Sequence, residues 1–134
     1  SGTRGPLYGP EDLRDDARLG FAIISSPEIE AEGLPRAIER MLARLADRPV
    51  YLSVDVDVLD PSHAPGTGTP EAGGMTSREL LAMIRALRAV NLVGADVVEV
   101  APAYDHAQLT AIAASHITYE IISAMTKETV SAGR

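Results

Sequence analysis

The sequence predicts an α/β protein in which a parallel sheet lies between two layers of helices. Two apolar runs, residues 50–58 and 93–100, have the length and the valine content of buried strands. An amphipathic stretch with helical spacing lies between them, and a longer one follows the second run. Strands that alternate with helices favour a parallel sheet covered on both faces. The 134 residues are enough for one modest domain with its own core.

The first part of the chain predicts two helices and a further strand. Residues 10–19 begin with proline and end before Gly20, which is typical of a short helix. Residues 21–25 are a short apolar run, which we interpret as one strand of a partial sheet of about three to four strands. Residues 34–46 predict an amphipathic helix. Its apolar positions recur at helical spacing: Leu34, Ile38, Met41, Leu42 and Leu45.

A long loop follows the first apolar run. Residues 61–74 contain three prolines and four glycines, and a loop of this length between regular elements is usually functional. Thr76 and Glu79 then match a capping box, which predicts the start of a helix. The buried stripe of that helix comprises Leu80, Leu81, Ile84 and Leu87.

The second apolar run leads into the last helix. Pro102 cannot continue a central strand, so the strand at 93–100 should end just before it. Asp105 with Gln108 resembles another N-cap pair, which predicts a long helix that ends at about Met125. The polar tail from Thr126 is expected to fray.

Composition excludes several classes of function. The net charge of −7 argues against nucleic acid and anionic membranes as partners, and its negative field suits a metal ion or a cationic substrate. The absence of cysteine rules out disulfides, thiolate chemistry and cysteine zinc sites. No apolar run approaches membrane-spanning length and no signal-peptide pattern is present, so a cytoplasmic location is expected.

Asp55 and Asp57 are the strongest candidates for chemistry. In a strand they would share a face, about 7 Å apart. Two close carboxylates at the end of a strand are costly to ionise without a cation, and α/β sheets place ligands at that end. The pair therefore predicts a site for a hard divalent ion such as Mn²⁺ or Mg²⁺. An Asp-x-Asp pair alone also occurs in glycosyltransferases and phosphotransferases, and solvated acids are the simplest alternative.

Other polar side chains have two interpretations each. Glu99 ends an apolar strand and would either pair with a planar guanidinium or stabilise a loop or helix end. The hydroxyls of Thr67 and Thr69 would either point into the site or stabilise turns.

The three histidines differ in their sequence context. His116 falls on the apolar face of the last predicted helix, so we expect a packed core side chain. His63 and His106 fall in loops near the predicted site, where they would either line it or be exposed.

Four short motifs follow one another in a fixed order. They are G-T-R-G at 2–5, S-V-D-V-D-V-L-D-P at 53–61, A-P-G-T-G-T-P-E at 64–71 with G-G at 73–74, and D-V-V-E-V-A-P-A-Y-D at 96–105. This ordered set resembles the ureohydrolase family, which includes arginase, agmatinase, guanidinobutyrase and proclavaminate amidinohydrolase. The last motif is similar to the agmatinase-like branch, since arginases carry Asn-Pro there. The resemblance covers nearly the whole chain.

The resemblance implies a fold, a cofactor and a reaction. The fold would be the three-layer α/β/α arginase-like fold, and the cofactor two Mn²⁺ ions per complete active site. Asp55 would bridge both ions, Asp57 would bind one of them, and Glu99 with Thr69 would bind the guanidino substrate. Water activated by the two ions would attack the guanidinium carbon and release urea and an amine, as in the conversion of agmatine to putrescine. The resemblance places no catalytic proton shuttle in this chain.

The family's other metal ligands have no counterpart here. They are a histidine in an earlier loop and a D-x-H-x-x-x-D segment, so residues 1–134 resemble the C-terminal part of a single ureohydrolase domain. We expect a gap in the sheet between the strand at 50–58 and that at 21–25, weak metal binding and no activity for this chain alone. The expected partners are the N-terminal half of the domain and further copies, in a trimer or hexamer.

The substrate within the family is left open by these residues. Guanidinobutyrase, proclavaminate amidinohydrolase and a non-catalytic metal-binding fragment are the alternatives to agmatinase. The side chains in reach of the substrate's tail would be Tyr8, Tyr104 and His106.

Overall fold

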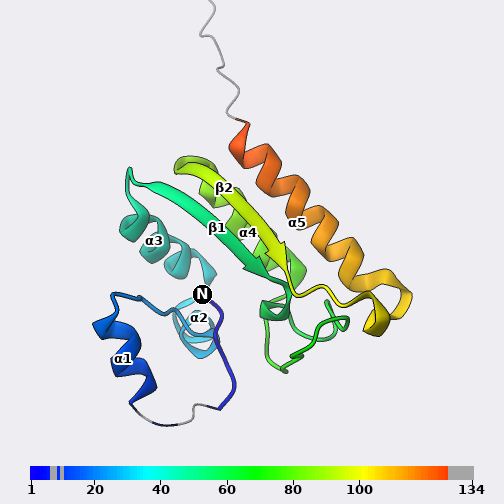
Figure 1. The fold of residues 1–134 in the computed structure, drawn as a ribbon. Helices are drawn as coiled ribbons and strands as arrows, with labels where there is room; N and C mark the ends of the chain where they lie inside the picture. The colour runs from blue at the N-terminus through cyan, green and yellow to red at the C-terminus, as the bar shows by residue number, and fades with distance from the viewer. Residues whose placement is uncertain (7–8, 10, 127–134) are drawn as a thin grey trace, which may run out of the picture.

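The computed structural model describes residues 1–6, 9 and 11–126, and Figure 1 shows their arrangement. The helices are α1 (Asp12–Arg18), α2 (Ser26–Glu32), α3 (Leu34–Leu45), α4 (Ser77–Ala86) and α5 (Leu109–Met125), and the strands are β1 (Pro49–Asp55) and β2 (Asn91–Val98). Short 3-10 turns are η1 (Val56–Val58), η2 (Leu87–Ala89), η3 (Pro102–Tyr104) and η4 (His106–Gln108). The predicted alternation of strands and helices is confirmed. Pro10 and the predicted tail beyond Thr126 lie outside the described residues.

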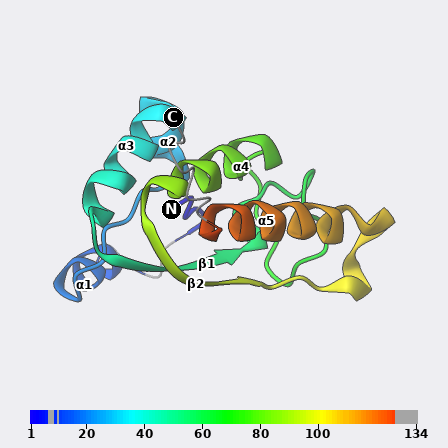
Figure 2. The same cartoon turned by 90° about the horizontal axis from the view of Figure 1, so that it is seen from above.

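The sheet consists of β1 and β2, which run parallel, with Ser53 opposite Asp96 and Asp55 opposite Val98. Side chains alternate along β1 as a strand requires, so Val54 is buried whereas Tyr51 is 63% exposed. Viewed along the sheet, α3, α4 and α5 all lie on one side of it (Figure 2). The described residues thus form one helical layer on a parallel sheet, and the second predicted layer is not among them.

The predicted strand at residues 21–25 is wrong. Only Ser25 makes an isolated parallel bridge, to Thr3. Ser25 also begins α2, because its side chain accepts the Glu28 N–H and Glu28 reaches back to the Ser25 backbone in a capping box. Phe21 is 63% exposed. A short apolar run needs a neighbouring strand to pair with, and the described part of the chain provides a two-stranded sheet instead of three to four strands.

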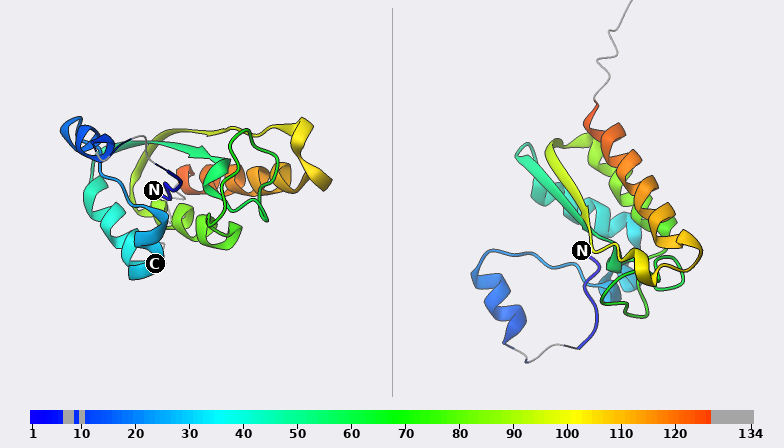
Figure 3. Two further views of the ribbon diagram at one scale, coloured as in Figure 1. Left: turned by 90° about the horizontal axis from the view of Figure 1, so that it is seen from below. Right: turned by 45° about the vertical axis from the view of Figure 1, so that its right-hand side comes forward.

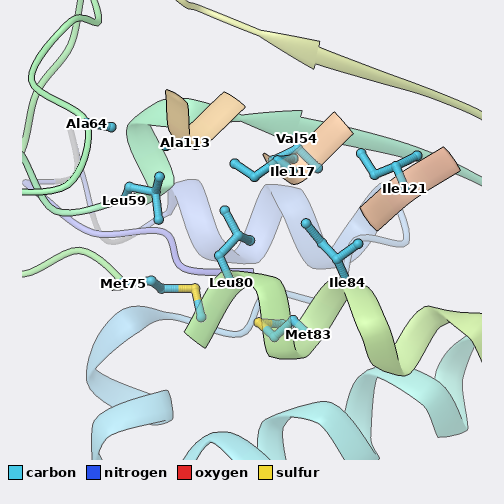
Figure 4. Close-up of a cluster of buried hydrophobic side chains, with 10 residues drawn as sticks. All are labelled: Val54, Leu59, Ala64, Met75, Leu80, Met83, Ile84, Ala113, Ile117 and Ile121. Carbon is cyan, nitrogen blue, oxygen red and sulfur yellow. The ribbon is translucent and has the colours of Figure 1, made fainter. Parts of the chain in front are cut away.

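The core joins the sheet to α4 and α5, as Figure 4 shows for its buried side chains. Val54 of β1 packs with Ile84 of α4 and Ile117 of α5 in one cluster. Leu59 and Met75, from the two ends of the long loop, belong to the same cluster. The ends are also bonded to each other, since Asp60 N–H donates to the Met75 carbonyl at 2.9 Å. The long loop therefore starts and finishes on the core.

Helix starts and ends follow the sequence signals closely. The predicted Thr76–Glu79 capping box opens α4, with Glu79 N–H donating to Thr76 Oγ1 at 3.2 Å. Asp105 is not the N-cap residue of α5 as predicted, because the helix begins at Leu109 and its N-cap is Gln108. The Asp105 carboxylate nevertheless accepts the N–H groups of Thr110 and Ala111 in the first turn, at 2.9 Å each. Gln108 is not its reciprocal partner, because its backbone is left-handed and its side chain makes no cap bond.

Candidate metal centre

The acidic pair lies at a turn, not on one strand face. β1 ends at Asp55, and Asp57 lies within the 3-10 turn η1. The Asp55 carboxylate accepts the Asp57 N–H at 3.0 Å and thereby starts this turn. The prediction that the strand continues to residue 58 is therefore wrong. The two carboxylates still follow each other at the carboxyl end of β1, where parallel sheets place their ligands.

The long loop returns to the acidic pair through Thr69. Thr69 Oγ1 donates to Asp57 Oδ2 at 2.8 Å. Thr69 is exposed, so its hydroxyl is accessible from the same side as the carboxylate. One predicted substrate-binding residue thus directly contacts one predicted metal ligand.

β1 and β2 run parallel, as the right-hand view of Figure 3 shows, so their carboxyl ends lie at the same end of the sheet. Glu99 follows directly after β2. Its φ of 67° is left-handed, which is strained for a residue other than glycine and is common at functional sites. This backbone ends the strand at Val98, earlier than predicted. A β-carbon placed on Gly68 would lie 3.9 Å from Glu99 Oε2, so the loop that carries Thr69 passes beside this carboxylate.

The charges of the three acids act on one another. Burial raises the pKa of Asp55 above its ordinary value, and the negative charges of Asp57 and Glu99 raise it further, against the opposing effect of the Asp57 N–H. Like charges thus gather at one end of the sheet without a positive side chain that offsets them at Asp55. A cation bound by Asp55 and Asp57 would remove this cost, so the two carboxylates fit a hard divalent ion.

Buried hydrogen bonds hold the loop in this position. Gly66 N–H donates to the buried Thr110 hydroxyl at 2.7 Å, and Ala101 N–H donates to the Gly66 carbonyl at 2.8 Å. A β-carbon on Gly66 would lie 2.5 Å from Asp105 Cβ, so glycine is required for this approach. Thr67 is also buried, and its hydroxyl has no hydrogen-bond partner among the described residues.

None of the three histidines lines the groove that contains the acidic pair. His116 is exposed, so its predicted place in the core is wrong: α5 is apolar around most of its circumference, and the sequence could not show which face is covered. His63 Nδ1 lies 3.2 Å from Ser77 Oγ and lines a small cavity between α4 and α5 that His116 also lines. His106 is exposed, as is Tyr104, and Tyr8 lies outside the described residues.

The described residues supply only part of a metal site. Among them, no group of three or more histidine, aspartate or glutamate side chains is arranged to hold a metal ion. A groove of about 600 Å³ runs along the free edge of β1, from Leu45 to Asp57 and Thr69. In the described part of the chain, this edge pairs with no other strand. The expected opening beside the acidic strand is therefore present, and it leads to the acidic pair.

Comparison with known proteins identifies the group of proteins to which this arrangement belongs. The Arginase family model matches residues 1–124. The chain belongs to the arginase family. An agmatinase of Chromobacterium violaceum is 43% identical over 117 residues, which is 87% of this chain and 36% of that protein. A Schizosaccharomyces pombe relative is 49% identical over 130 residues, 97% of this chain and 33% of that protein.

Solved structures of the arginase family share the fold. The proclavaminate amidino hydrolase from Streptomyces clavuligerus superposes with a TM-score of 0.87 at 40% identity, over 92% of this chain and 41% of that chain. An arginase from Bacillus subtilis has a TM-score of 0.81 at 30% identity, over 96% and 45% of the respective chains. The predicted arginase-like α/β class is thus confirmed. The chain spans about a third of the length of the curated relatives it matches.

Sequence reasoning missed one residue at this site. Arg4 contacts the turn that contains Asp57 and the loop after Thr69, through hydrogen bonds to backbone carbonyls only. The signal was an arginine inside the G-T-R-G motif at 2–5. Nothing in the sequence shows that this motif meets a turn more than 50 residues away.

Proposed function

We propose that this chain is the Asp-x-Asp part of a Mn²⁺-dependent amidinohydrolase, which cleaves a guanidino C–N bond and releases urea and an amine. The observation that carries this proposal is the meeting of the acidic pair with Thr69 and Glu99 at one end of the sheet. The agmatinase relatives support a guanidine as the substrate class.

Each acidic residue has one role in this proposal. Asp55 and Asp57 would hold Mn²⁺, two ions per complete site, together with ligands from the rest of the protein. Bound ions supply Lewis acidity and a water whose pKa lies near neutrality. Thr69 orients the Asp57 carboxylate, because its hydroxyl donates to one lone pair of Asp57 Oδ2. The other lone pairs of the carboxylate stay available for a metal ion.

Glu99 is the proposed substrate anchor. A carboxylate can pair with a planar guanidinium through two parallel hydrogen bonds, which fixes orientation as well as position. Glu99 is exposed on a left-handed backbone beside Gly68, whose lack of a side chain keeps this approach open. The net charge of −7 attracts cationic guanidines to the site.

The remaining metal ligands would come from the part of an arginase-family protein that residues 1–134 do not cover. The groove along β1 is where additional chain would add a strand and bring those ligands to the acidic pair. We propose that residues 1–134 alone bind Mn²⁺ weakly and are inactive, and that the complete protein assembles as a trimer or hexamer. Below, "complete enzyme" means these residues joined to the remainder of an arginase-family chain.

Urea release by the complete enzyme tests this function. The substrates are agmatine, 4-guanidinobutyrate and guanidinoproclavaminate, each with Mn²⁺ and with a chelator. We expect Mn²⁺-dependent urea from at least one of them, with agmatine the best substrate. Glu99→Gln should reduce kcat/KM by about a hundredfold, since one charge-assisted pair to the guanidinium is lost. Absence of urea from every guanidine contradicts the proposal, and urea release by the 134-residue chain alone contradicts its incompleteness.

A further inference from the structure

Arg4 binds the backbone of both segments that form the candidate site. Its Nη2 donates to the carbonyls of Asp57 at 2.6 Å, Leu59 at 3.1 Å and Glu71 at 2.6 Å. Its Nε donates to the Glu71 carbonyl at 3.0 Å, and its Nη1 lies 3.4 Å from the Val58 carbonyl. One side chain thus joins the turn after β1 to the end of the long loop.

The segment that carries Arg4 is itself fixed on its other side. Gly2 N–H donates to the Ile24 carbonyl at 2.7 Å, and Ser26 N–H donates to the Thr3 carbonyl at 3.0 Å. A β-carbon on Gly2 would lie 2.5 Å from Val58 Cγ2, so this segment packs closely against the same turn. Arg4 is therefore held from the start of α2 and acts on the turn from a fixed position.

We propose that Arg4 is a positioning residue that fixes Asp57 for metal binding by holding its backbone. A three-residue 3-10 turn bonds few of its own carbonyls, so it keeps its geometry only when other donors bind them. The planar guanidinium has five N–H donors in a rigid fork and can bind several carbonyls at once. Through the Glu71 carbonyl the same fork holds the loop two residues after Thr69, which bonds the Asp57 carboxylate.

The inference rests on the proposed function, because it assigns Arg4 a purpose only if Asp57 binds an ion. It also predicts why lysine would not replace arginine. A lysine ammonium is a compact charge on a flexible stem, and it lacks the rigid fork through which Arg4 reaches the carbonyls of residues 57, 59 and 71. A role in net charge alone would be retained by lysine.

The test measures the Mn²⁺ dissociation constant of the complete enzyme, from the electron paramagnetic resonance signal of free Mn²⁺. Arg4→Ala and Arg4→Lys are compared with Asp57→Ala as the reference for a lost ligand. Arg36→Ala is the matched control, because Arg36 is exposed on α3 and, among the described residues, its side chain pairs with Glu39 alone. Arg4→Ala and Arg4→Lys should each bind Mn²⁺ at least about tenfold more weakly, the effect of losing a group that orients a metal ligand. Arg36→Ala should bind it as the unaltered enzyme does.

Kinetics separate positioning from general instability. At low Mn²⁺ the Arg4 variants should lose kcat with little change in the KM for the guanidine, and saturating Mn²⁺ should restore most of the kcat. If Arg4→Lys folds and binds Mn²⁺ as tightly as the unaltered enzyme, the inference is wrong. Should Arg4→Ala fail to fold, the Mn²⁺ affinity of Arg4→Lys is the deciding measurement. If neither the unaltered enzyme nor Asp57→Ala binds Mn²⁺, the proposed function itself fails. If Asp57→Ala weakens Mn²⁺ binding and Arg4→Ala does not, the proposed role of Arg4 is wrong and the proposed function stands.

Discussion

Asp55 illustrates how a functional residue opposes stability. Its carboxylate is partly buried beside two other acids, so without a cation it repels its neighbours. Its first hydrogen bond, from the Asp57 N–H, shapes the turn and leaves the charge uncompensated. A residue selected for stability alone would be neutral here, and this conflict is what a binding site produces.

Asp55→Asn should therefore stabilise the metal-free 134-residue chain at pH 7. The gain should be about 0.5 kcal/mol, the size of a screened charge pair, because solvent still reaches this half-buried carboxylate. An asparagine oxygen can still accept the Asp57 N–H, so the turn should persist. Urea unfolding of both chains measures the difference, and Glu30→Gln at an exposed position of α2 is the control. A loss of stability in Asp55→Asn would show that the acids do not repel one another.

Asp60 contrasts with Asp55, because hydrogen bonds stabilise its ionised carboxylate. Hydrogen bonds from the Ser62 hydroxyl and N–H and from the Gly73 N–H lower its pKa from 3.8 to about 2. A carboxyl with a lowered pKa contributes stability that is fully present above its unfolded value and is lost as pH falls through its folded value. Asp60 thus links the start of the long loop to its end in the ionised form.

We expect the unaltered chain to lose stability between about pH 4 and pH 2 through Asp60. Asp60→Asn should be less stable at pH 7 and should show a shallower decline over this range. Unfolding free energies measured at intervals from pH 7 to pH 2 test this. Parallel curves for the two chains would mean that Asp60 does not titrate as its hydrogen bonds require.

Helix α4 positions the end of the long loop, and its cap is local in sequence. Thr76 Oγ1 and the Glu79 carboxylate satisfy each other's backbone N–H groups. Thr76→Ala should therefore cost about 1 kcal/mol of unfolding free energy. Thr76→Ser is the control, because serine keeps the hydroxyl that accepts the Glu79 N–H. Equal stability of the two variants, measured by urea unfolding, would contradict the role of the capping box.

The long loop depends on one close approach between elements. Gly66 lies against Asp105, and a β-carbon there would come within 2.7 Å of the Asp105 Cα. Gly66→Ala should cost about 1–3 kcal/mol through overpacking. Gly68→Ala is the matched control for stability, since the nearest atom, Glu99 Oε2, is 3.9 Å away. Thermal unfolding of both variants measures the contrast, and a tolerated Gly66→Ala would show that this loop adjusts freely.

Most elements with local signals were predicted, and those that depend on distant contacts were not. Helix α2 is the exception, because its capping box of Ser25 and Glu28 is local and yet this helix was not predicted. The amphipathic repeat of α3 and the capping box of α4 are written in neighbouring residues. The short run at 21–25 has the composition of a strand, but strand formation depends on a partner that the described residues do not provide. The turn at Asp57 and the reach of Arg4 likewise depend on residues far along the chain.

At the scale of the whole molecule, the sheet is open where the site needs more ligands. One helical layer covers β1 and β2 on one side (Figure 2), and Tyr51 of β1 and Val93 of β2 are exposed. The motifs of the acidic pair and of Glu99 could be read from sequence, because each is short and continuous. The remaining metal ligands could not be identified from this sequence, because the chain spans about a third of the length of its relatives. No described helix is both long and apolar enough to cross a membrane.

Anomalous diffraction at the manganese edge, from crystals of the complete enzyme grown with Mn²⁺, tests the central claim most directly. The account predicts two peaks at this end of the sheet, within coordination distance of the Asp55 and Asp57 carboxylates. Asp57→Ala should lose the peak that Asp57 holds. A density map with no manganese within coordination distance of either carboxylate, at saturating Mn²⁺, would contradict it.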